Sequence, residues 1–248
     1  WAFVVLQGSN SVQIVDAFSG AMVGALSGTG AAPQDVLITP DGRTAFVHGF
    51  LSRTVTAYDL GPLLDGTSLD ARRIGTTRTD GREPLAADVL RGKQIFYDAS
   101  DPRMSLDGYI ACASCHLDGA HDGQTWDFTD RGEGLRNTID LRGRGGVAHG
   151  PLHWTANFDE VQDFENDIRL AFGGQGFLPG ATWRSGTISD PLGDPKAGLS
   201  RELDDLAAYV TSLSAAPPSP YRPAADVHSE EALRGADVFE AAGCAACH

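Results

Sequence analysis

The sequence is poor in positive charge. Its 19 lysine and arginine residues stand against 33 aspartate and glutamate residues, which gives a formal net charge of −14 at pH 7. A surface of this sign repels phosphate backbones and anionic lipid head groups, which argues against binding to nucleic acid or to an anionic membrane. An acidic surface suits a basic or neutral protein partner, and plain solubility explains it equally well.

Methionine, cysteine and long apolar runs are also scarce. Methionine occurs twice, as Met22 and Met104. The sequence shows no signal peptide and no transmembrane run, but that absence decides nothing, because we expect the chain to be part of a longer protein. Whether the protein associates with a membrane is therefore left open.

All four cysteines belong to two copies of the motif Cys-x-x-Cys-His, at residues 112–116 and 244–248. This spacing is the attachment signature of c-type haem: two thiols bond to the vinyl groups of one porphyrin, and the adjacent histidine reaches the iron. The sequence therefore predicts two haem c groups. Their protein ligands are Cys112, Cys115 and His116 for the first and Cys244, Cys247 and His248 for the second.

Three other roles for these cysteines are weaker. A shared zinc site would have to join pairs that stand 132 positions apart, from Cys115 to Cys247,. A thioredoxin-like redox pair would need a βαβ context, and neither motif follows an apolar strand. Two cysteines with this spacing are also too close for an ordinary stabilising disulfide.

A similar segment precedes each motif. Residues 90–96 read LRGKQIF and residues 233–239 read LRGADVF. Each predicts an amphipathic helix whose phenylalanine faces a haem, and the repeated order of helix and motif indicates a duplicated domain. Residues 200–213 predict a further helix, with Ser200 as the N-cap and apolar residues at helical spacing. It is interpreted as the closing helix of a cytochrome c domain, followed by a proline-rich linker.

The first 60 residues have a β pattern. Short apolar or β-branched runs predict strands at residues 3–6, 12–15, 35–38, 44–47 and 54–58. The segment SVQIVD at residues 11–16 recurs as RTVTAYD at residues 53–59. The aspartates of the two segments are separated by roughly one propeller-blade period of about 40–45 residues. This pattern resembles the YVTN family of β-propellers and covers little more than one blade.

The expected fold is therefore mixed. A partial β-propeller of about one blade is followed by a mainly α-helical cytochrome c-type domain and by the start of a second one. The expected boundaries are 1–75 for the propeller fragment, 76–216 for the first haem domain, and 217–248 for the linker and the beginning of the second. A propeller needs several blades and a haem domain needs residues beyond His248, so the chain is expected to be truncated at both ends.

The segment after the first motif differs from that of a simple electron-transfer cytochrome c. Because both methionines precede the motif, an iron with histidine and methionine ligands would require Met104 to fold back. Two histidines, five-coordinate iron or a water ligand are favoured instead. His121 is the candidate for a distal iron ligand, with His149 and His153 as rivals. The candidates for pairing with haem propionates are Arg136, Arg142 and Arg144.

From about residue 85 onward the chain resembles the di-haem cytochrome c peroxidase family, which includes di-haem enzymes that oxidise protein tryptophans. The resemblance rests on the two haem motifs, on Arg136-Asn137-Thr138 and on residues 153–157. It implies that Asn137 helps to bind calcium between two haem domains and that Trp154 bridges the haems, although residues 153–157 depart from the family's W-D-G. The family's peroxidatic acid has no secure match, and Gln175 lies near its place.

The predicted function is a di-haem c-type cytochrome that transfers electrons and reduces hydrogen peroxide, with a small cytochrome or cupredoxin as its redox partner. The alternative is a non-catalytic electron-transfer module attached to a propeller that binds a partner. An ordinary core tryptophan is likewise the alternative to a bridging Trp154. Because bacteria attach haem c outside the cytoplasm, the expected location is the periplasm, the extracellular space or the cell surface.

Overall fold

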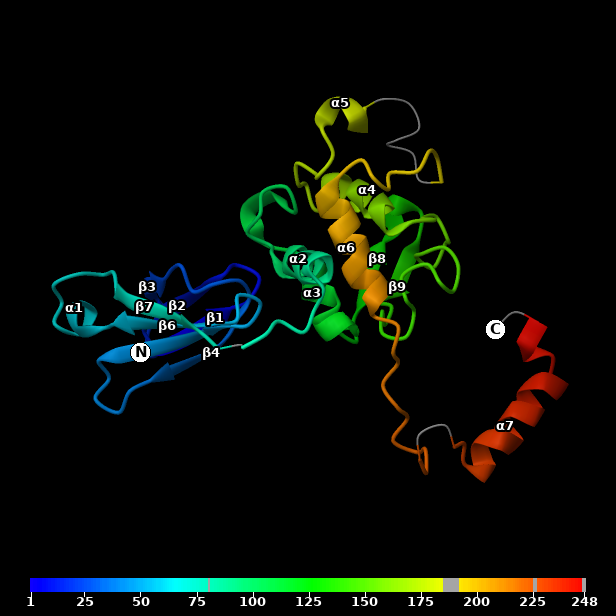
Figure 1. The fold of residues 1–248 in the computed structure, drawn as a ribbon, viewed down its shortest axis with the longest axis horizontal. Coiled ribbons are helices and arrows are strands. Elements are labelled where there is room, and N and C mark those ends of the chain that lie inside the picture. The colour runs from blue at the N-terminus through cyan, green and yellow to red at the C-terminus, as the bar shows by residue number, and fades with distance from the viewer. Residues whose placement is uncertain (80, 185–191, 225–226, 247–248) are drawn as a thin grey trace. The chain divides into compact units, whose positions relative to one another are not determined.

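The structure, a computed structural model, describes residues 1–79, 81–184, 192–224 and 227–246 (Figure 1). It consists of two compact units, Trp1–Ser214 and Ala215–His248, each of which is described by itself. The predicted boundary at residue 216 falls next to this division, whereas the predicted boundary at residue 75 lies inside the first unit.

Two antiparallel sheets open the first unit (Figure 1). In both sheets the strands follow one another in chain order. The three-stranded sheet contains β1 (Ala2–Leu6), β2 (Ser11–Val15) and β3 (Met22–Leu26). The four-stranded sheet contains β4 (Pro33–Ile38), β5 (Thr44–Gly49), β6 (Thr54–Asp59) and β7 (Arg72–Arg78), with the short helix α1 (Gly61–Leu64) between the last two strands.

Alternating burial explains why these segments form strands. Successive side chains of a strand point to opposite faces, so Val12 and Ile14 of β2 are buried together, as are Ala45 and Val47 of β5,. All four belong to one hydrophobic cluster to which both sheets contribute. The five predicted strands lie within β1, β2, β4, β5 and β6, so their existence is confirmed. The other two gave a weaker signal, because β3 contains a glycine and β7 is exposed throughout.

The expected partial β-propeller is wrong: the described residues form two open sheets of three and four strands and no closed propeller. The sequence repeat reflects turn chemistry instead. Asp16 accepts hydrogen bonds from the backbone N–H groups of Phe18 and Ser19 at the end of β2. Asp59 accepts one from the N–H of Gly61 at the end of β6. Aspartate stabilises turns of this kind locally, so its recurrence carries no information about sheet closure.

Helices, loops and a hairpin make up the rest of the first unit. The hairpin pairs β8 (Thr125–Phe128) with β9 (Gly134–Asn137). The helices are α2 (Ala87–Tyr97), α3 (Cys112–Cys115), α4 (Glu165–Leu170), α5 (Gly180–Trp183) and α6 (Arg201–Ser212). The expected mainly α-helical domain is therefore also wrong. Every glycine from position 119 to position 150 has a positive φ, a conformation that interrupts helices and favours turns,.

Helices α2 and α6 pack against each other at a glycine (Figure 1). A Cβ atom at Gly92 would lie 1.8 Å from the backbone oxygen of Asp205, so the two backbones are in direct contact there. Phe96 of α2 and Tyr209 of α6 pack edge to face beside this point, with ring centroids 5.0 Å apart. Ser200 caps α6 by accepting a hydrogen bond from the N–H of Leu203, as the sequence predicts,.

The sheets and the helices share a hydrophobic core. Leu51, which follows β5, belongs to the same buried cluster as Phe96 of α2. The backbone oxygen of Leu51 also accepts a hydrogen bond of 2.9 Å from the side chain of Gln94. The ammonium nitrogen of Lys93 lies 4.7 Å from the ring centroid of Phe50, a cation–π contact,. Residues 1–75 therefore pack directly on the helical part.

A buried ion pair fixes the segment before α6. The Nζ of Lys196 lies 2.6 Å from Oδ1 of Asp163, and both side chains are only 1% exposed. The other carboxylate oxygen accepts hydrogen bonds from the backbone N–H groups of Asp159 and Glu160. Lys196→Met would leave a buried carboxylate without its cation, so we expect a loss of about 3 kcal/mol of unfolding free energy. Urea unfolding of the purified protein measures it.

An exposed pair in the same unit provides the control. The guanidinium of Arg43 lies 3.5 Å from the carboxylate of Asp65, and both side chains are 56% exposed. Arg43→Met should leave the unfolding midpoint nearly unchanged, because exposed ion pairs contribute little. Adding Asp163→Asn to Lys196→Met should restore part of the lost stability. Equal effects of Lys196→Met and Arg43→Met would contradict the assignment of Lys196 and Asp163 as a stabilising pair.

The second unit contains α7 (Glu230–Ala241), capped by Ser229, which accepts a hydrogen bond of 3.2 Å from the N–H of Ala232. The predicted helix at residues 233–239 lies within it. A short 3-10 segment, Cys244–Ala246, follows. Among the described residues of both units, no helix combines the length and the apolar character that crossing a bilayer requires.

Candidate functional site

The first Cys-x-x-Cys-His motif forms one helical turn. Cys112 and Cys115 are the first and last residues of α3, and the N–H of His116 donates to the backbone oxygen of Cys112 at 2.9 Å. Ser114 closes the start of the turn by accepting a hydrogen bond from the N–H of Ala111. Positions three apart share one face of a helix, so both thiols point to the same side.

That side is an apolar cavity of about 210 Å³ inside the first unit. Cys112, Cys115 and His116 all line it, although none of them is fully exposed or fully buried. The long helices α2 and α6 supply further wall residues, as do α4 and the 3-10 turn before it. The apolar part of the wall includes Phe96, Leu152, Val161, Phe164, Ile168 and Leu206.

Both thiols in the cavity are protonated at neutral pH. Burial raises the pKa of Cys112 to about 12 and also raises the pKa of Cys115. Thiols that exchange disulfides or act as nucleophiles have a lowered pKa instead, and Cys112 and Cys115 are free rather than joined to each other,. A thioredoxin-like redox role is therefore disfavoured. Uncharged thiols that line an apolar cavity are instead suited to bonding with a hydrophobic cofactor.

The ring of His116 lines the cavity and is held by the backbone. Its Nδ1 lies 3.3 Å from the backbone oxygen of Ala120, and in the tautomer that donates this hydrogen bond Nε2 keeps its lone pair,. Burial lowers the pKa of His116, and the backbone oxygens of Ala120 and Ile139 act in the opposite direction. A neutral imidazole whose Nδ1 is held by a backbone oxygen is suited to binding iron through Nε2,.

Across the part of the chain that the structure describes, no three His, Cys, Asp or Glu side chains are grouped as a metal site. Cys244 is exposed and lies in the second unit, and Cys247 and His248 lie outside the described residues. The argument against a zinc site shared by the two motifs therefore rests on their separation in the sequence. Attachment of a second haem to Cys244, Cys247 and His248 stays a prediction.

A second histidine lines the same cavity, surrounded by hydrogen-bond acceptors. Nδ1 of His153 lies 2.8 Å from Oδ1 of Asn157 and 3.3 Å from Oε1 of Glu133, and Nε2 lies 3.5 Å from Oδ2 of Asp167. Glu133 also accepts a hydrogen bond of 3.0 Å from the hydroxyl of Thr155. His153 was one of the predicted rivals for the distal iron site, but both of its nitrogens are engaged by these neighbours.

The two acids beside His153 were missed by sequence reasoning. Glu133 precedes β9 and Asp167 lies on α4, so 34 positions separate them and no motif connects them. Both line the cavity, and their side chains are 8% and 13% exposed. Asp167 is one of several acids between positions 159 and 167. Nothing in the sequence distinguishes it from the neighbours that only stabilise the fold.

Asn137 and Trp154, the predicted calcium ligand and haem bridge, lie together. The indole N–H of Trp154 donates a hydrogen bond of 2.9 Å to the backbone oxygen of Asn137, at the end of β9. Both residues line the cavity, and Trp154 is 60% exposed, which argues against an ordinary core tryptophan. Electron transfer through Trp154 and calcium binding by Asn137 remain predictions.

Several other predicted residues lie away from the cavity wall. His121 is exposed and its Nδ1 accepts a hydrogen bond from the N–H of Gly123. Gln175 is exposed, and its backbone N–H donates to the oxygen of Pro102. His149 is exposed, and Met104 is fully buried in a separate core cluster. None of these four is among the cavity-lining residues.

The arginines after the motif divide into two groups. Arg136 and Arg144 line the cavity, so they are placed to pair with acidic groups of a bound cofactor,. Arg142 instead pairs with Asp140, at 2.7 Å between nitrogen and oxygen. Pairing of Arg136 and Arg144 with propionates stays a prediction, and Arg142 already has a partner within the protein.

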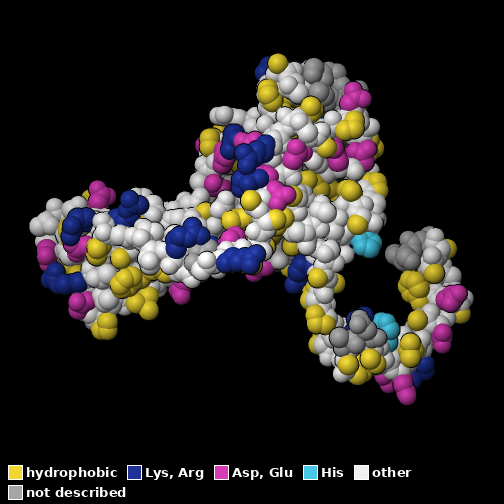
Figure 2. Space-filling view, in the orientation of Figure 1, with side chains coloured by type: hydrophobic (Ala, Val, Ile, Leu, Met, Phe, Trp, Pro, Cys, Tyr) yellow, Lys and Arg dark blue, Asp and Glu magenta, His cyan; other side chains and the backbone are white. Residues whose placement is uncertain are grey.

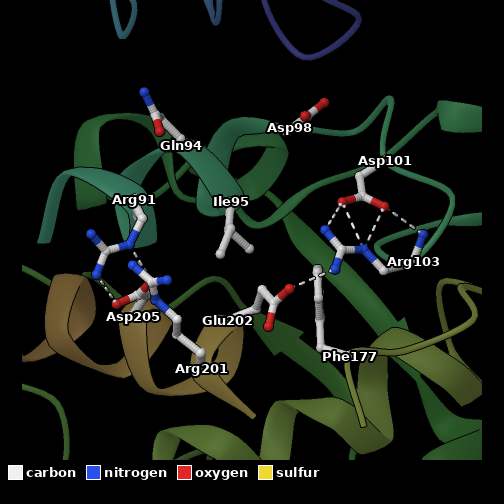
Figure 3. Close-up of a pocket in the computed structure, with 10 residues that line it drawn as sticks. All are labelled: Arg91, Gln94, Ile95, Asp98, Asp101, Arg103, Phe177, Arg201, Glu202 and Asp205. Carbon is white, nitrogen blue, oxygen red and sulfur yellow. Dashed lines mark hydrogen bonds and ion pairs between the residues drawn. The ribbon is translucent and has the colours of Figure 1, made fainter. Parts of the chain in front are cut away.

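A second pocket lies on the surface between α2 and α6 (Figure 3). In it Arg91 forms two hydrogen bonds to Asp205, of 2.6 and 2.8 Å, and Arg103 pairs with both Asp101 and Glu202. Basic and acidic side chains lie next to one another on the face drawn in Figure 2. Arg91 joins α2 to α6, and Arg103 joins the loop after α2 to Glu202 of α6, so the charged side chains of this pocket stabilise the fold.

Comparison with known proteins gives one similarity. Over 172 residues the chain is 30% identical to hydrazine synthase subunit gamma of Kuenenia stuttgartiensis. The match covers 66% of this chain and 44% of that protein, so the chain spans less than half of the relative's length. No family model matches the chain, and no solved structure matches it.

These comparisons correct the assignment to the di-haem cytochrome c peroxidase family fused to a YVTN-type propeller. The assignment is wrong: the similarity is to a hydrazine synthase subunit, no family model matches, and the described residues contain no grouped metal ligands. The motifs behind the assignment were short. The segment at residues 90–96 reflects the packing of α2 on α6, and a haem-attachment signature is dictated by the cofactor rather than by one family.

Proposed function

We propose that the chain is a c-type haem protein that transfers electrons. One observation carries this proposal: a single apolar cavity brings together both thiols and the imidazole of the first motif. Cys112 and Cys115 would hold the porphyrin through thioether bonds, and His116 would bind the iron. When bound there, a haem supplies one-electron chemistry, whose potential the protein sets through ligation, burial and hydrogen bonding.

The chain's own residues prepare this site in three ways. The hydrogen bond of His116 to Ala120 orients the imidazole. Apolar side chains from α2 and α6 line the cavity and would shield a bound cofactor from water, which lowers the local dielectric,. Arg136 and Arg144 supply positive charge at the wall for the propionates. The second motif is proposed to hold a second haem, because it repeats the same spacing and is preceded by the helix α7.

The protein is further proposed to work with a protein partner outside the cytoplasm. Its relative is named as a subunit, which supports a place in an assembly. The negative net charge suits a basic or neutral redox partner, such as a small cytochrome or cupredoxin,. The periplasmic or cell-surface location follows from the site of haem attachment in bacteria and depends on the haem itself.

Reduction of hydrogen peroxide stays a prediction beside simple electron transfer. It would consume two electrons and two protons for each peroxide and release two waters, and it needs an iron with an open sixth position. Electron transfer alone is compatible with six ligands on both irons. EPR spectra of the oxidised and half-reduced protein, recorded before and after addition of peroxide, separate the two, because only an open iron gives a high-spin signal that peroxide removes.

The test of haem attachment is the mass of the denatured protein. We expect the polypeptide mass plus two haems after purification from a bacterial host that matures c-type cytochromes, with iron but no zinc by metal analysis. A pyridine haemochrome spectrum should show thioether-linked haem. A bare polypeptide mass, or zinc in place of iron, would refute the proposed function.

A further inference from the structure

The cavity contains a histidine that the proposed attachment of haem leaves without a role. His153 lines the same wall as His116 but belongs to a different segment, the loop between β9 and α4. Its three polar neighbours are Glu133, Asn157 and Asp167. They stand 2.8–3.5 Å from the ring nitrogens. Among the described residues they are not part of a metal site.

The ring of His153 is fixed in place. It packs against Phe158, with ring centroids 4.3 Å apart, and edge to face against Phe164, at 5.1 Å. The backbone of the loop is strained as well, because His153 has a φ of 66° and Ala156 a φ of 54°. Positive φ costs a residue with a side chain about 1 kcal/mol or more, and such strain persists where the surroundings impose it, often at functional sites.

The surroundings of His153 favour its charged form. Burial lowers the pKa of His153 and is the largest single influence. The hydrogen bond and the charge of Asp167, together with Asn157 and Glu133, outweigh it and raise the pKa above its usual value of 6.5. The remaining charged side chains in the wall are Arg136 and Arg144. Their positive charges act to lower the pKa of His153. These neighbours make the charged form easier to reach than in a free histidine, and a protonated ring donates from both nitrogens,.

We propose that His153, held between Glu133 and Asp167, is the proton donor of the haem cavity. The proton acceptor would be a small ligand in the cavity with a basic nitrogen or oxygen atom. This inference rests on the proposed function, because it needs haem in the cavity. It adds a site for a reacting ligand, which electron transfer alone would not need.

The proton balance involves no further co-reactant. The Nε2–H group would turn from Asp167, 3.5 Å away, to the ligand; its N–H bond then breaks, the proton forms a new bond to the ligand, and a neutral imidazole remains with Nδ1 beside Asn157. Solvent returns the proton to His153 past Asp167, because the side chains of the two residues are 18% and 13% exposed. Glu133 and Asp167 are positioning residues that keep the ring oriented and its proton affinity high.

The probe is carbon monoxide bound to the reduced haem-loaded protein, whose stretching frequency reports hydrogen-bond donors near the ligand. We expect the band to move to lower frequency as the pH falls, with a midpoint above 6.5. His153→Gln should abolish this pH dependence. Asp167→Asn should keep it but move the midpoint to lower pH, because one of the groups that stabilise the imidazolium is lost. His149→Gln, at an exposed histidine, is the matched control and should change nothing.

The outcomes distinguish this inference from the proposed function. A purified protein with no haem spectrum refutes the proposed function itself. A protein that contains haem overturns only the present inference if carbon monoxide fails to bind, or if the band shows the same pH dependence in wild type and His153→Gln. If Asp167→Asn lowers the unfolding midpoint but leaves the titration midpoint in place, Asp167 only stabilises the fold and the proposed positioning role is refuted.

Discussion

Cys112→Ala combined with Cys115→Ala is expected to remove one of two haems from the protein. The two thiols stand on one face of α3 and line one cavity, so they can reach a single porphyrin together. Without them no covalent bond remains at this site, and acid extraction should release any haem that His116 still holds. The denatured mass should fall by one haem, and the haem absorbance per protein should drop to about half, since one of the two attachment motifs is lost.

The variant Ser114→Ala is the control for the doubly substituted protein. Ser114 lies between the two cysteines and is exposed, and its hydroxyl only closes the start of the helical turn. It should retain both haems and lose little stability. If the protein without Cys112 and Cys115 still carried two covalent haems, or if Ser114→Ala lost one, the roles given to these residues would be wrong.

Gly92→Ala is expected to destabilise the protein strongly although it adds a single methyl group. The new Cβ would lie 1.8 Å from the backbone oxygen of Asp205, and neither backbone can move without separating α2 from α6. Overpacking costs about 1–3 kcal/mol and more when backbone atoms are involved. A backbone clash belongs at the upper end of this range and alanine regains about 1 kcal/mol of helix propensity, so we expect a net loss of about 2 kcal/mol. Urea unfolding followed by circular dichroism measures it.

The matched control is Gly235→Ala, at the equivalent position of the segment before the second motif. No atom lies within 4 Å of a Cβ at Gly235, so alanine should be tolerated there and should favour α7. Gly92→Ala should also disturb the haem spectrum, because Phe96 of α2 and Leu206 of α6 both line the cavity. Similar stabilities for the two variants would show that the helices are not held in contact at Gly92.

The local parts of this structure could be predicted from the sequence. Ser200 and the spacing of apolar residues located α6, and alternating residues located five strands, because capping and alternation depend on nearby positions. The motif at residues 112–116 forms a helical turn for the same reason. The architecture could not be predicted: Asp16 and Asp59 mark similar turns, and similar turns occur in open sheets as well as in propellers.

The candidate site was only partly predictable, for a related reason. Cys112, Cys115 and His116 are defined by their spacing, and all three line the cavity. Glu133 and Asp167 reach His153 only because the hairpin and α4 fold over the same space, which no local pattern encodes. His121 was chosen for its closeness in sequence to the motif, yet it is an exposed loop residue.

The contact of Leu51 and Phe50 with α2 restricts how this protein can have evolved. Two modules joined by a linker can be shuffled between genes, because each keeps its own interior. Here Phe96, which lines the cavity, also belongs to the cluster that contains Leu51, and Lys93 lies against Phe50. An ancestor that exchanged its sheets for another domain would have exposed one wall of the cofactor site, so sheets and helices are expected to have been inherited together.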